Sequence, residues 1–478
     1  MTTSTINQPR QSKGGSAEGL AQHPPATMIP DHLRSDEYAY LDQQGHIYLD
    51  YTGASLPSRT QLQAHAARLA EYTSGNPHSI NPTSEVSNTL IARTRARILE
   101  FLRADPNEYA VIFTSNATAA ARLVGESYRF RRNSRLVLTA DNHNSINGLR
   151  SFAQRAKAKT VYIPIAQEDL RTASKEVSAA LRSRALRCIP KSSAPSLFAF
   201  PAQSNFTGVT HPLSWITLAQ EQGYDVLLDA AAYLPTNDLD LGSLKPEFVI
   251  VSWYKLFGFP TGVGCLIARR DALSKLDRPW FSGGTVDAVS VRVPWHGLAS
   301  DEAAFEDGTV NFLSIPDVEV GINWIQQAGR RETATRVLKL TEGLLSSLRC
   351  LKHSNGQPMV VIYGPANIEN RGGTMAFNLL DSNGDIIDSE VVACDAAAAN
   401  ISIRTGCFCN PGVGEVAFGL RREGICAYIK KRSEAIDARV PLPRLASAVR
   451  VSFGIASHQR DADAFVQLVK KMYRDRVD

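Results

Sequence analysis

Short apolar runs that alternate with helix-like segments are the feature that most restricts the fold of this sequence. Seven such runs lie at 109–115, 134–140, 160–165, 196–202, 224–230, 247–253 and 262–269. Helix candidates separate most of them, among them 117–128, 175–186 and 213–223. Strands that are apolar along their whole length and separated by helices form a parallel sheet covered on both faces. The pattern therefore predicts a doubly wound α/β domain.

A smaller domain is predicted after a long helical stretch at 316–350. Three further strand-like runs follow that stretch, at 372–380, 401–406 and 448–454. They are typical of an α+β domain, in which strands and helices are less regularly alternated. We therefore divide the chain into three parts, a disordered leader at 1–30, a large domain at 31–335 and a small C-terminal domain at 336–478.

The first thirty residues lack the apolar core of a signal peptide. They are rich in Ser, Thr, Gln, Gly and Pro, a composition typical of disordered segments. Because acidic residues are scarce there, an organelle address within the leader is the alternative.

Composition and charge exclude several classes of function. The chain has 52 Lys and Arg against 47 Asp and Glu, with no basic block that would indicate a nucleic-acid partner. No apolar run reaches the ~18 residues that a membrane span needs. The seven cysteines are scattered and odd in number, which favours a reducing compartment over a disulfide framework. We expect a cytoplasmic protein without a nucleic-acid or membrane partner.

Two ionisable residues stand at the ends of apolar runs, where the ligands of α/β sheets bind. Lys255 follows the run at 247–253, and an amine in an apolar crevice can lose its proton and form a Schiff base with an aldehyde. A lysine that extends from a strand end to solvent is the alternative. Asp229 ends the preceding run, where a protonated pyridine nitrogen, as in pyridoxal phosphate (PLP), would be a suitable partner. A helix N-cap would explain this aspartate as well.

A phosphate site is predicted where the run at 109–115 passes into a helix. Backbone N–H groups and the helix dipole favour an anion there, and the residues at this turn include Ser115, Asn116, Ala117 and Thr118. Ser252 and Tyr254, beside Lys255, could add hydroxyl groups. Ordinary helix capping would place the same residue types at this position.

Two polar residues follow other strand-like runs. His143 could stack on a planar cofactor and move protons near neutral pH, although an exposed loop histidine would fit the sequence too. Asn205 is an amide in a turn whose partner the sequence does not identify.

The segment RTGCFCNPG at 404–412 is a second candidate centre. Cys409 lies in a loop bounded by Gly and Pro, where a mobile, accessible thiol near Arg404 would be a thiolate nucleophile. Metal ligation is the alternative for Cys407 and Cys409, but a Cys-x-Cys pair without further ligands is half a zinc site, and we expect no metal. Arg450 offers a fork that suits a substrate carboxylate or a structural ion pair.

Together these motifs resemble the class V aminotransferase family of PLP enzymes, and within it the cysteine desulfurase-like domain of molybdenum cofactor sulfurases. The resemblance runs from about residue 48 to residue 465. The segments that carry it include YLDYTGAS (48–55), PAQSNF (201–206), YKLFGFPTG (254–262) and RTGCFCNPG (404–412). It implies an α/β structure of PLP fold type I, like aspartate aminotransferase, with a mainly parallel sheet in the large domain and a smaller α+β C-terminal domain.

The resemblance also implies roles for individual residues. Lys255 would hold PLP as a Schiff base and Asp229 would hold the pyridine nitrogen, with His143 stacked on the ring. The other implied cofactor contacts are Asn116, Ala117, Thr118, Asn205, Ser252, Tyr254 and Thr309. Of these, Thr309 matches a position that contacts phosphate from the partner subunit, which implies a homodimer with shared sites.

The implied reaction is desulfuration of L-cysteine. Arg450, with Arg404 and Asn205 nearby, would bind the substrate, and the amine of Lys255 would move the Cα proton. The thiolate of Cys409 would attack the substrate sulfur, giving a persulfide and alanine. Since a molybdenum cofactor sulfurase continues into a further domain that receives the cofactor and this sequence ends at Asp478, we expect a separate sulfur acceptor. It would be molybdenum cofactor, a protein or a small molecule.

Two departures from the family pattern accompany the resemblance. Many bacterial desulfurases have a glutamine three residues after the aspartate, whereas this chain has Ala232. The sulfurases also tend to carry a cysteine just after NPG, where this chain has Val413 and Gly414. The alternatives are therefore another PLP-dependent reaction, such as C–S lysis, decarboxylation or transamination, or a non-catalytic scaffold with the same fold.

Overall fold

The computed structural model describes residues 30–182, 194–438 and 447–477. The predicted leader at 1–30 lies outside these residues except for Pro30, which begins the first helix. The predicted division into 31–335 and 336–478 stays a prediction.

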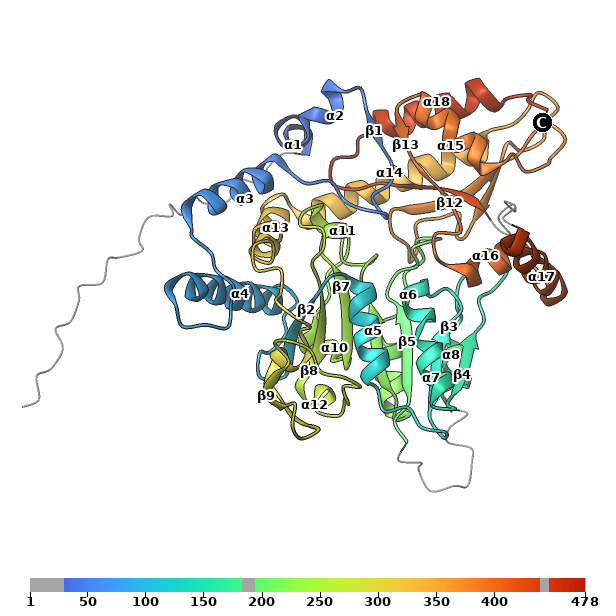
Figure 1. The fold of residues 1–478 in the computed structure, drawn as a ribbon. Coiled ribbons are helices and arrows are strands. Elements are labelled where there is room, and N and C mark those ends of the chain that lie inside the picture. The colour runs from blue at the N-terminus through green and yellow to red at the C-terminus, as the bar shows by residue number, and fades with distance from the viewer. Residues whose placement is uncertain (1–29, 183–193, 439–446, 478) are drawn as a thin grey trace, which may run out of the picture.

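A seven-stranded sheet, here called the large sheet, forms the centre of the molecule (Figure 1). In spatial order its strands are β2 (Tyr109–Thr114), β8 (Gly264–Arg269), β7 (Phe248–Ser252), β6 (Asp225–Asp229), β5 (Leu197–Pro201), β3 (Arg135–Thr139) and β4 (Lys159–Ile163). All seven predicted runs form these strands. β8 runs antiparallel to both of its neighbours, β2 and β7, and the other neighbouring strands in this sheet are parallel, so the prediction of a mainly parallel sheet is confirmed.

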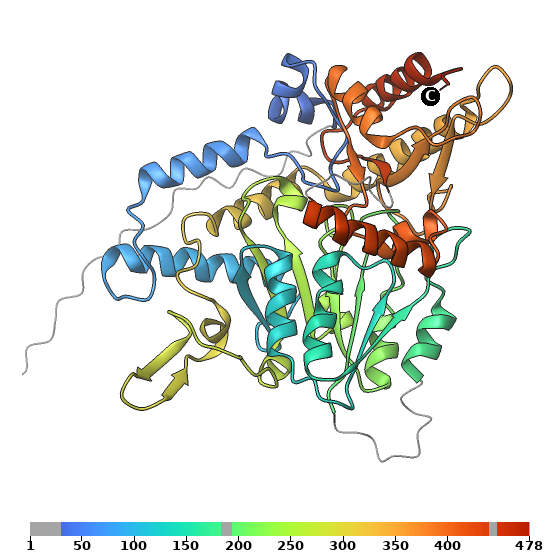
Figure 2. The same ribbon diagram turned by 45° about the vertical axis from the view of Figure 1, so that its right-hand side comes forward.

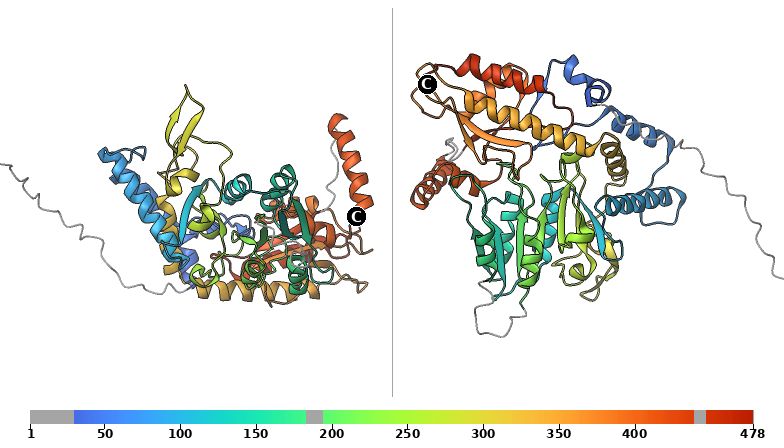
Figure 3. Two further views of the ribbon diagram at one scale, coloured as in Figure 1. Left: turned by 90° about the horizontal axis from the view of Figure 1, so that it is seen from below. Right: turned by 180° about the vertical axis from the view of Figure 1, so that it is seen from behind.

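Successive side chains of each strand point to opposite faces of the large sheet, so the apolar core is divided between the two faces. On β5, Phe198 and Phe200 contribute to one core cluster and Leu197 and Ala199 to the other. Helices cover both faces (Figures 2 and 3), with α5 (Ala117–Ser127) and α7 (Leu149–Arg155) contributing to the second cluster. The first cluster contains residues of α4 (Pro82–Phe101), α8 (Ser174–Arg182), α9 (Trp215–Glu221) and α13 (Pro316–Gln327). This double cover explains why the strands are apolar on both faces.

A four-stranded antiparallel sheet, here called the small sheet, lies at the carboxyl ends of the parallel strands. Its order is β11 (Val360–Tyr363), β12 (Thr374–Leu379), β15 (Ala448–Ser452) and β14 (Arg404–Gly406). A separate apolar cluster joins it to α14 (Arg330–Cys350), α15 (Ser389–Ala398) and α18 (Gln459–Tyr473). The chain's early strand β1 (Ile47–Tyr48) pairs with β13 (Ile401–Ser402), which brings residues 47–55 next to this sheet.

Two sequence predictions need correction. The helical stretch at 316–350 is two helices, α13 and α14, because Gly329 between them has a φ of +82° that an α-helix cannot contain. The run at 401–406 is likewise two short strands, β13 and β14, in different sheets.

The sequence analysis did not predict the hairpin of β9 (Val286–Ser290) and β10 (Trp295–Leu298), which projects from the molecule (Figure 2). The remaining helices are α1 (Pro30–Glu37), α2 (Ala39–Gln43), α3 (Arg59–Glu71), α6 (Asn144–Asn147), α10 (Leu241–Leu244), α11 (Tyr254–Phe257), α12 (Arg270–Leu273), the 3₁₀ helix Asp301–Phe305, α16 (Pro411–Ala417) and α17 (Arg422–Ala438). Within the described residues, no helix has the length and apolar character that crossing a bilayer requires.

Candidate active site

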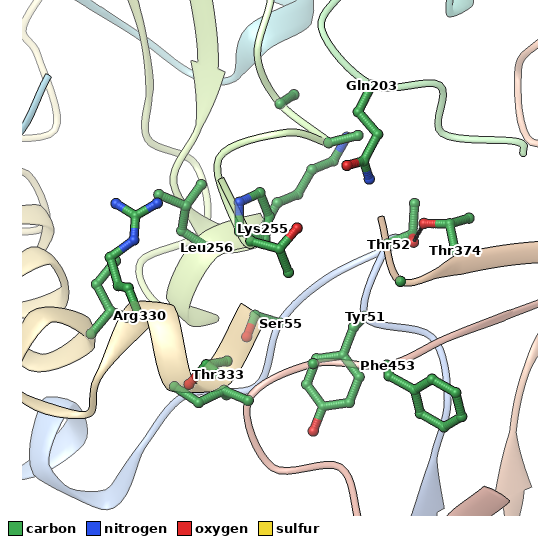
Figure 4. Close-up of a pocket in the computed structure, with 18 residues that line it drawn as sticks. Tyr51, Thr52, Ser55, Gln203, Lys255, Leu256, Arg330, Thr333, Thr374 and Phe453 are labelled. Carbon is green, nitrogen blue, oxygen red and sulfur yellow. Dashed lines mark hydrogen bonds between the residues drawn. The ribbon is translucent and has the colours of Figure 1, made fainter. Parts of the chain in front are cut away.

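Lys255 lies where two cavities adjoin at the carboxyl ends of the parallel strands. The larger cavity has a volume of about 390 Å³. The smaller, about 50 Å³, separates Lys255 from residues near the small sheet, among them Thr52 and Thr374 (Figure 4). The residues that line both cavities are Gln203, Ala231, Ala232 and Lys255.

Nine of the predicted site residues line the larger cavity. They are Asn116, Ala117, Thr118, His143, Asn205, Asp229, Ser252, Tyr254 and Lys255. Arg404, Cys409, Arg450 and Thr309 are not among its lining residues. The structure thus brings together the predicted cofactor residues other than Thr309, whereas Cys409 and the two predicted substrate arginines are not part of the cavity lining.

Lys255 stands one turn after β7, in the short helix α11. Burial lowers the pKa of its amine, an effect that the nearby guanidinium of Arg450 increases and the carboxylate of Asp229 opposes. A lowered pKa means that more of the amine is neutral at a given pH than for an ordinary lysine. A neutral amine is the form that attacks an aldehyde or accepts a proton from carbon.

Asp229 is the last residue of β6, the strand beside β7, and is 8% exposed. One carboxylate oxygen, Oδ1, accepts the N–H of Ala231 at 3.0 Å. Because neighbouring parallel strands end at the same edge of a sheet, Asp229 and Lys255 line one cavity. This juxtaposition is what the spacing of the strand-like runs predicts.

The N-terminus of α5 forms one end of the larger cavity. The side chain of Asn116 caps this helix by accepting the N–H of Ala119 at 2.9 Å, and Ser252 Oγ accepts the N–H of Ala117 at 3.0 Å. Thr118 Oγ1 lies 2.6 Å from the hydroxyl of Ser145, a cavity residue that the sequence analysis missed. The capping alternative is therefore realised, and hydroxyl groups and a helix N-terminus also face the cavity together, as an anion requires.

His143 caps the short helix α6 beside this hydroxyl pair. Its Nδ1 accepts the N–H of Ser145 at 3.1 Å, which leaves Nε2 to carry the proton of a neutral ring. Burial lowers the pKa of His143, and the positive charge of Lys255 lowers it further. His143 is therefore a neutral cavity residue near pH 7, and the alternative of an exposed loop histidine does not hold.

The loop that carries Cys409 is fixed at its backbone. Phe408 and Cys409 both adopt positive φ angles, 51° and 54°, an unusual conformation for residues other than glycine. Asn144 N–H donates to the carbonyl of Cys409 at 2.7 Å, and Asn205 Nδ2 donates to the carbonyl of Phe408 at 2.7 Å. The thiol side chain is exposed, and these two hydrogen bonds anchor the backbone at Phe408 and Cys409.

Asn410 completes this clamp on the cysteine loop. Its side-chain nitrogen donates to the carbonyl of Asp141 at 2.7 Å and to Oδ1 of Asn205 at 3.0 Å. The amide of Asn205 therefore contacts the loop through both of its ends, although Asn205 also lines the cavity. The sequence analysis did not single out Asn410, because its partners lie more than 200 residues away in the chain.

Cys407 is exposed in the same loop as Cys409. No group of three or more His, Cys, Asp or Glu side chains that could hold a metal ion occurs in the described part of the chain.

The two predicted substrate arginines converge on Asp50, which the sequence analysis did not single out. Arg404 and Arg450 are cross-strand partners in β14 and β15. Asp50 accepts Arg404 Nε at 2.9 Å and Arg450 Nη2 at 3.0 Å. Arg450 Nη1 donates to the carbonyl of Asn205 at 3.0 Å. The ion-pair alternative for Arg450 is thus present, next to the cavity wall that Asn205 forms.

Thr309 lines a separate cavity of about 340 Å³ that shares Ser115 and Gly262 with the larger site cavity. Its hydroxyl oxygen accepts a hydrogen bond of 3.4 Å from Asn76 Nδ2. Its predicted contact from a partner subunit stays a prediction.

Comparison with known sequences shows that most of the chain matches one family model. Residues 47–465 match the model of "Aminotransferase class-V". Molybdenum cofactor sulfurase from Homo sapiens is 33% identical over 91% of this chain, and that from Solanum lycopersicum is 33% identical over 96%. The alignments cover 50% and 59% of those two proteins, so the chain spans little more than half the length of these relatives.

Solved structures share the fold. A cysteine desulfurase from Thermococcus onnurineus NA1 superposes with a TM-score of 0.76 at 21% identity, covering 94% of this chain and 99% of that one. The cysteine desulfurase CsdA from Escherichia coli gives a TM-score of 0.72 at 18% identity, covering 93% and 98%. These similarities confirm the predicted α/β architecture of PLP fold type I.

Proposed function

Since the chain belongs to the class V aminotransferase family, we propose that it is a PLP-dependent cysteine desulfurase of the molybdenum cofactor sulfurase type. The observation that carries the proposal is the placement of Lys255 and Asp229 in one cavity, at the ends of neighbouring strands. The exposed thiol of Cys409 lies on a loop that Asn205 ties to the wall of that cavity.

The residues of the larger cavity fit PLP by the chemistry of their donors. Lys255 offers a buried amine of lowered pKa, Asp229 a carboxylate for the pyridine nitrogen, and the N-terminus of α5 offers N–H and hydroxyl groups for the phosphate. The volume of about 390 Å³ lies within the usual range for small-molecule sites. When bound, PLP withdraws electrons from the carbon atoms of an amino acid.

The side chains of this chain would perform the proton transfers and orient the substrate. The neutral amine of Lys255 would accept the Cα proton at Nζ and return a proton to carbon later. Asp229 would keep a negative charge beside the pyridine nitrogen. His143 would be neutral, with its proton on Nε2, and would stack on the pyridine ring. The N–H at Nε2 would be its hydrogen-bond donor.

Cys409 would then receive the sulfur. Its thiolate attacks the sulfur of L-cysteine, so that an S–S bond forms while the Cβ–S bond of the substrate breaks. The electron pair of the broken bond stays with the substrate carbon, which takes up a proton. The sum is cysteine plus an enzyme thiol giving alanine plus an enzyme persulfide, with atoms and electrons balanced.

The partners are proposed on the same basis. L-Cysteine would be the substrate, and the persulfide sulfur would pass to an acceptor, which would be molybdenum cofactor, a protein or a small molecule. The family position that Thr309 matches contacts phosphate from the partner subunit, so we propose a homodimer in which each subunit completes the phosphate site of the other. We place this activity in the cytoplasm, where thiols stay reduced.

Replacement of each cysteine in the loop tests the proposal. Cys409→Ala should retain the absorption band of bound PLP but lose the release of sulfide and alanine from L-cysteine in the presence of dithiothreitol. Cys407→Ala, in the same loop and also exposed, is the matched control and should keep most of the activity. Unchanged sulfide release by Cys409→Ala would reject the persulfide role, and a colourless protein that borohydride does not link to PLP at Lys255 would reject the cofactor assignment.

A further inference from the structure

A single buried carboxylate is shared by two arginines beside the proposed active site. Asp50 is 6% exposed and lies on the segment next to β15. Its two oxygens accept hydrogen bonds from Arg404 and Arg450. Arg404 and Arg450 face each other across β14 and β15, and like charges opposite each other in a sheet repel. Asp50 therefore holds together two side chains that would otherwise separate.

The surroundings of Asp50 are shaped around this three-residue unit. A Cβ atom on Gly53 would lie 2.6 Å from Asp50 Oδ2 and 2.8 Å from Arg404 Nη2, so only glycine leaves space for the ion pair. Arg450 is also fixed from its other side, since its guanidinium lies 4.7 Å from the ring centre of Phe408, the neighbour of Cys409. The unit is thus a rigid part of the structure that contacts the cysteine loop.

The unit formed by Asp50, Arg404 and Arg450 retains an unused hydrogen-bond donor. Arg450 is 3% exposed, and its Nε has no hydrogen-bond partner within the described residues. A buried N–H without an acceptor is unfavourable. One carboxylate against two guanidinium groups also leaves one positive charge uncompensated. Since Asn205 lines the cavity and its carbonyl accepts Arg450 Nη1, this charge lies directly behind the cavity wall.

We propose that Asp50 is a specificity-determining positioning residue that leaves a single positive charge for the carboxylate of the substrate. The inference rests on the proposed function, because it takes the cavity to be the amino-acid site. A site with one uncompensated charge suits an amino acid with one carboxylate, such as cysteine or alanine. A dicarboxylic amino acid such as aspartate would place its second carboxylate without a counter-charge, which is costly in a buried site.

The experiment compares the binding of two amino acids to the PLP-loaded protein by titration calorimetry. L-Alanine carries one carboxylate and L-aspartate carries two. Asp50→Asn keeps the size of the side chain but leaves two positive charges. It should shift the ratio of the two dissociation constants about tenfold or more towards aspartate. In kinetics, the KM for L-cysteine should change by a larger factor than kcat, because binding of the carboxylate is what changes.

A second variant keeps the test decisive if Asp50→Asn folds poorly. The double variant Asp50→Asn with Arg404→Gln returns the unit to one positive charge, carried by Arg450. It should regain a preference for alanine over aspartate, even if both affinities are lower. If the ratio of the two dissociation constants in the double variant is instead shifted towards aspartate relative to the unchanged protein, the charge of the unit does not set specificity and the proposal is wrong.

Asp42 provides a matched control. It too is shared by two arginines, since Arg34 Nε donates to it at 3.0 Å and Arg460 Nη2 at 2.7 Å, but it lines neither cavity. Asp42→Asn should lower stability without changing the ratio of the two dissociation constants. An equal shift of this ratio in Asp42→Asn and Asp50→Asn would show a general structural effect and would overturn the proposal. If the protein binds amino acids with the expected ratios but releases no sulfide, the proposed function fails while this inference stands.

Discussion

Two parts of the candidate site are built in different ways. They are the sheet wall, which carries Lys255 and Asp229, and the loop wall, which carries Cys409. Lys255 and Asp229 stand at the ends of β7 and β6, and the backbone hydrogen bonds of the large sheet fix their separation. Cys409 stands on a loop with two consecutive positive φ angles, held by the side-chain amides of Asn205 and Asn410 and by the backbone N–H of Asn144. A sheet edge tolerates the loss of one side chain, whereas a loop held by side chains changes its position when one is lost. The two walls should therefore respond to mutation differently.

The largest effect should come from the sheet wall. Lys255→Ala removes the amine that binds the cofactor and moves protons, so desulfuration should fall by a factor on the order of 10² to 10⁴ or more. The cysteine loop should stay in place, and Cys409 should react with iodoacetamide at the rate of the unchanged protein. Activity and alkylation assays measure the two responses.

Lys245→Ala is the control for this change. Lys245 is a half-exposed lysine paired with Glu108 at 2.7 Å, and its loss should leave both measurements unaltered. A slower or faster alkylation of Cys409 in Lys255→Ala would show that the two walls are not independent.

The next largest effect should come from the loop wall. Asn410→Ala removes one buried and one partly buried hydrogen bond and the cap that Asn410 Oδ1 gives α16 by accepting the N–H of Val413 at 3.4 Å. The carbonyl of Asp141 and Oδ1 of Asn205 then lack this donor, which costs about 1–3 kcal/mol for each unsatisfied group. Sulfide release should fall about tenfold or more while the absorption of bound PLP is unchanged. Asn81→Ala, which removes a comparable cap from α4, should lower thermal stability but not the rate. Loss of PLP absorption in Asn410→Ala would contradict the separation of the walls.

The sequence predicts the sheet wall better than the loop wall, and the reason is physical. Strands of a parallel sheet end at one edge, so residues that follow apolar runs, such as Lys255 and His143, can be assigned to one site from their position alone. Contacts such as Asn410 with Asp141, or Asp50 with Arg404, join residues separated by 269 and 354 positions. No local pattern encodes such contacts. The same limit explains why the break at Gly329 was missed, because Gly within a helical pattern does not by itself show that its φ is positive.

A smaller effect should be seen in the pH dependence with which the amine of Lys255, in the sheet wall, reacts with PLP. Burial lowers the pKa of Lys255, so the neutral, reactive amine is present at pH values below the ordinary lysine value of 10.5. The rate at which cofactor-free protein forms a borohydride-reducible adduct with PLP should therefore rise with pH and level off below pH 10.5. Asp229→Asn removes a charge that raises this pKa, so its profile should move to lower pH. A profile centred at or above 10.5 would show that Lys255 is not buried as described.

The smallest effect should come from a hydroxyl pair that joins α5, at the larger cavity, to α6, which contacts the cysteine loop. Thr118 Oγ1 on α5 lies 2.6 Å from Ser145 Oγ on α6, and the neighbouring Asn144 N–H donates to the carbonyl of Cys409. Ser145→Ala should weaken PLP binding by a few-fold, about what one neutral hydrogen bond contributes, measured by equilibrium dialysis. Thr118→Ser keeps a hydroxyl at the same site and should bind PLP normally. Since α6 supports the cysteine loop through its backbone and not through this hydroxyl, the rate of sulfide release at saturating PLP should not change in Ser145→Ala. A lower rate under that condition would mean that cofactor binding and the position of Cys409 are coupled through α6, and that the two walls act as one unit.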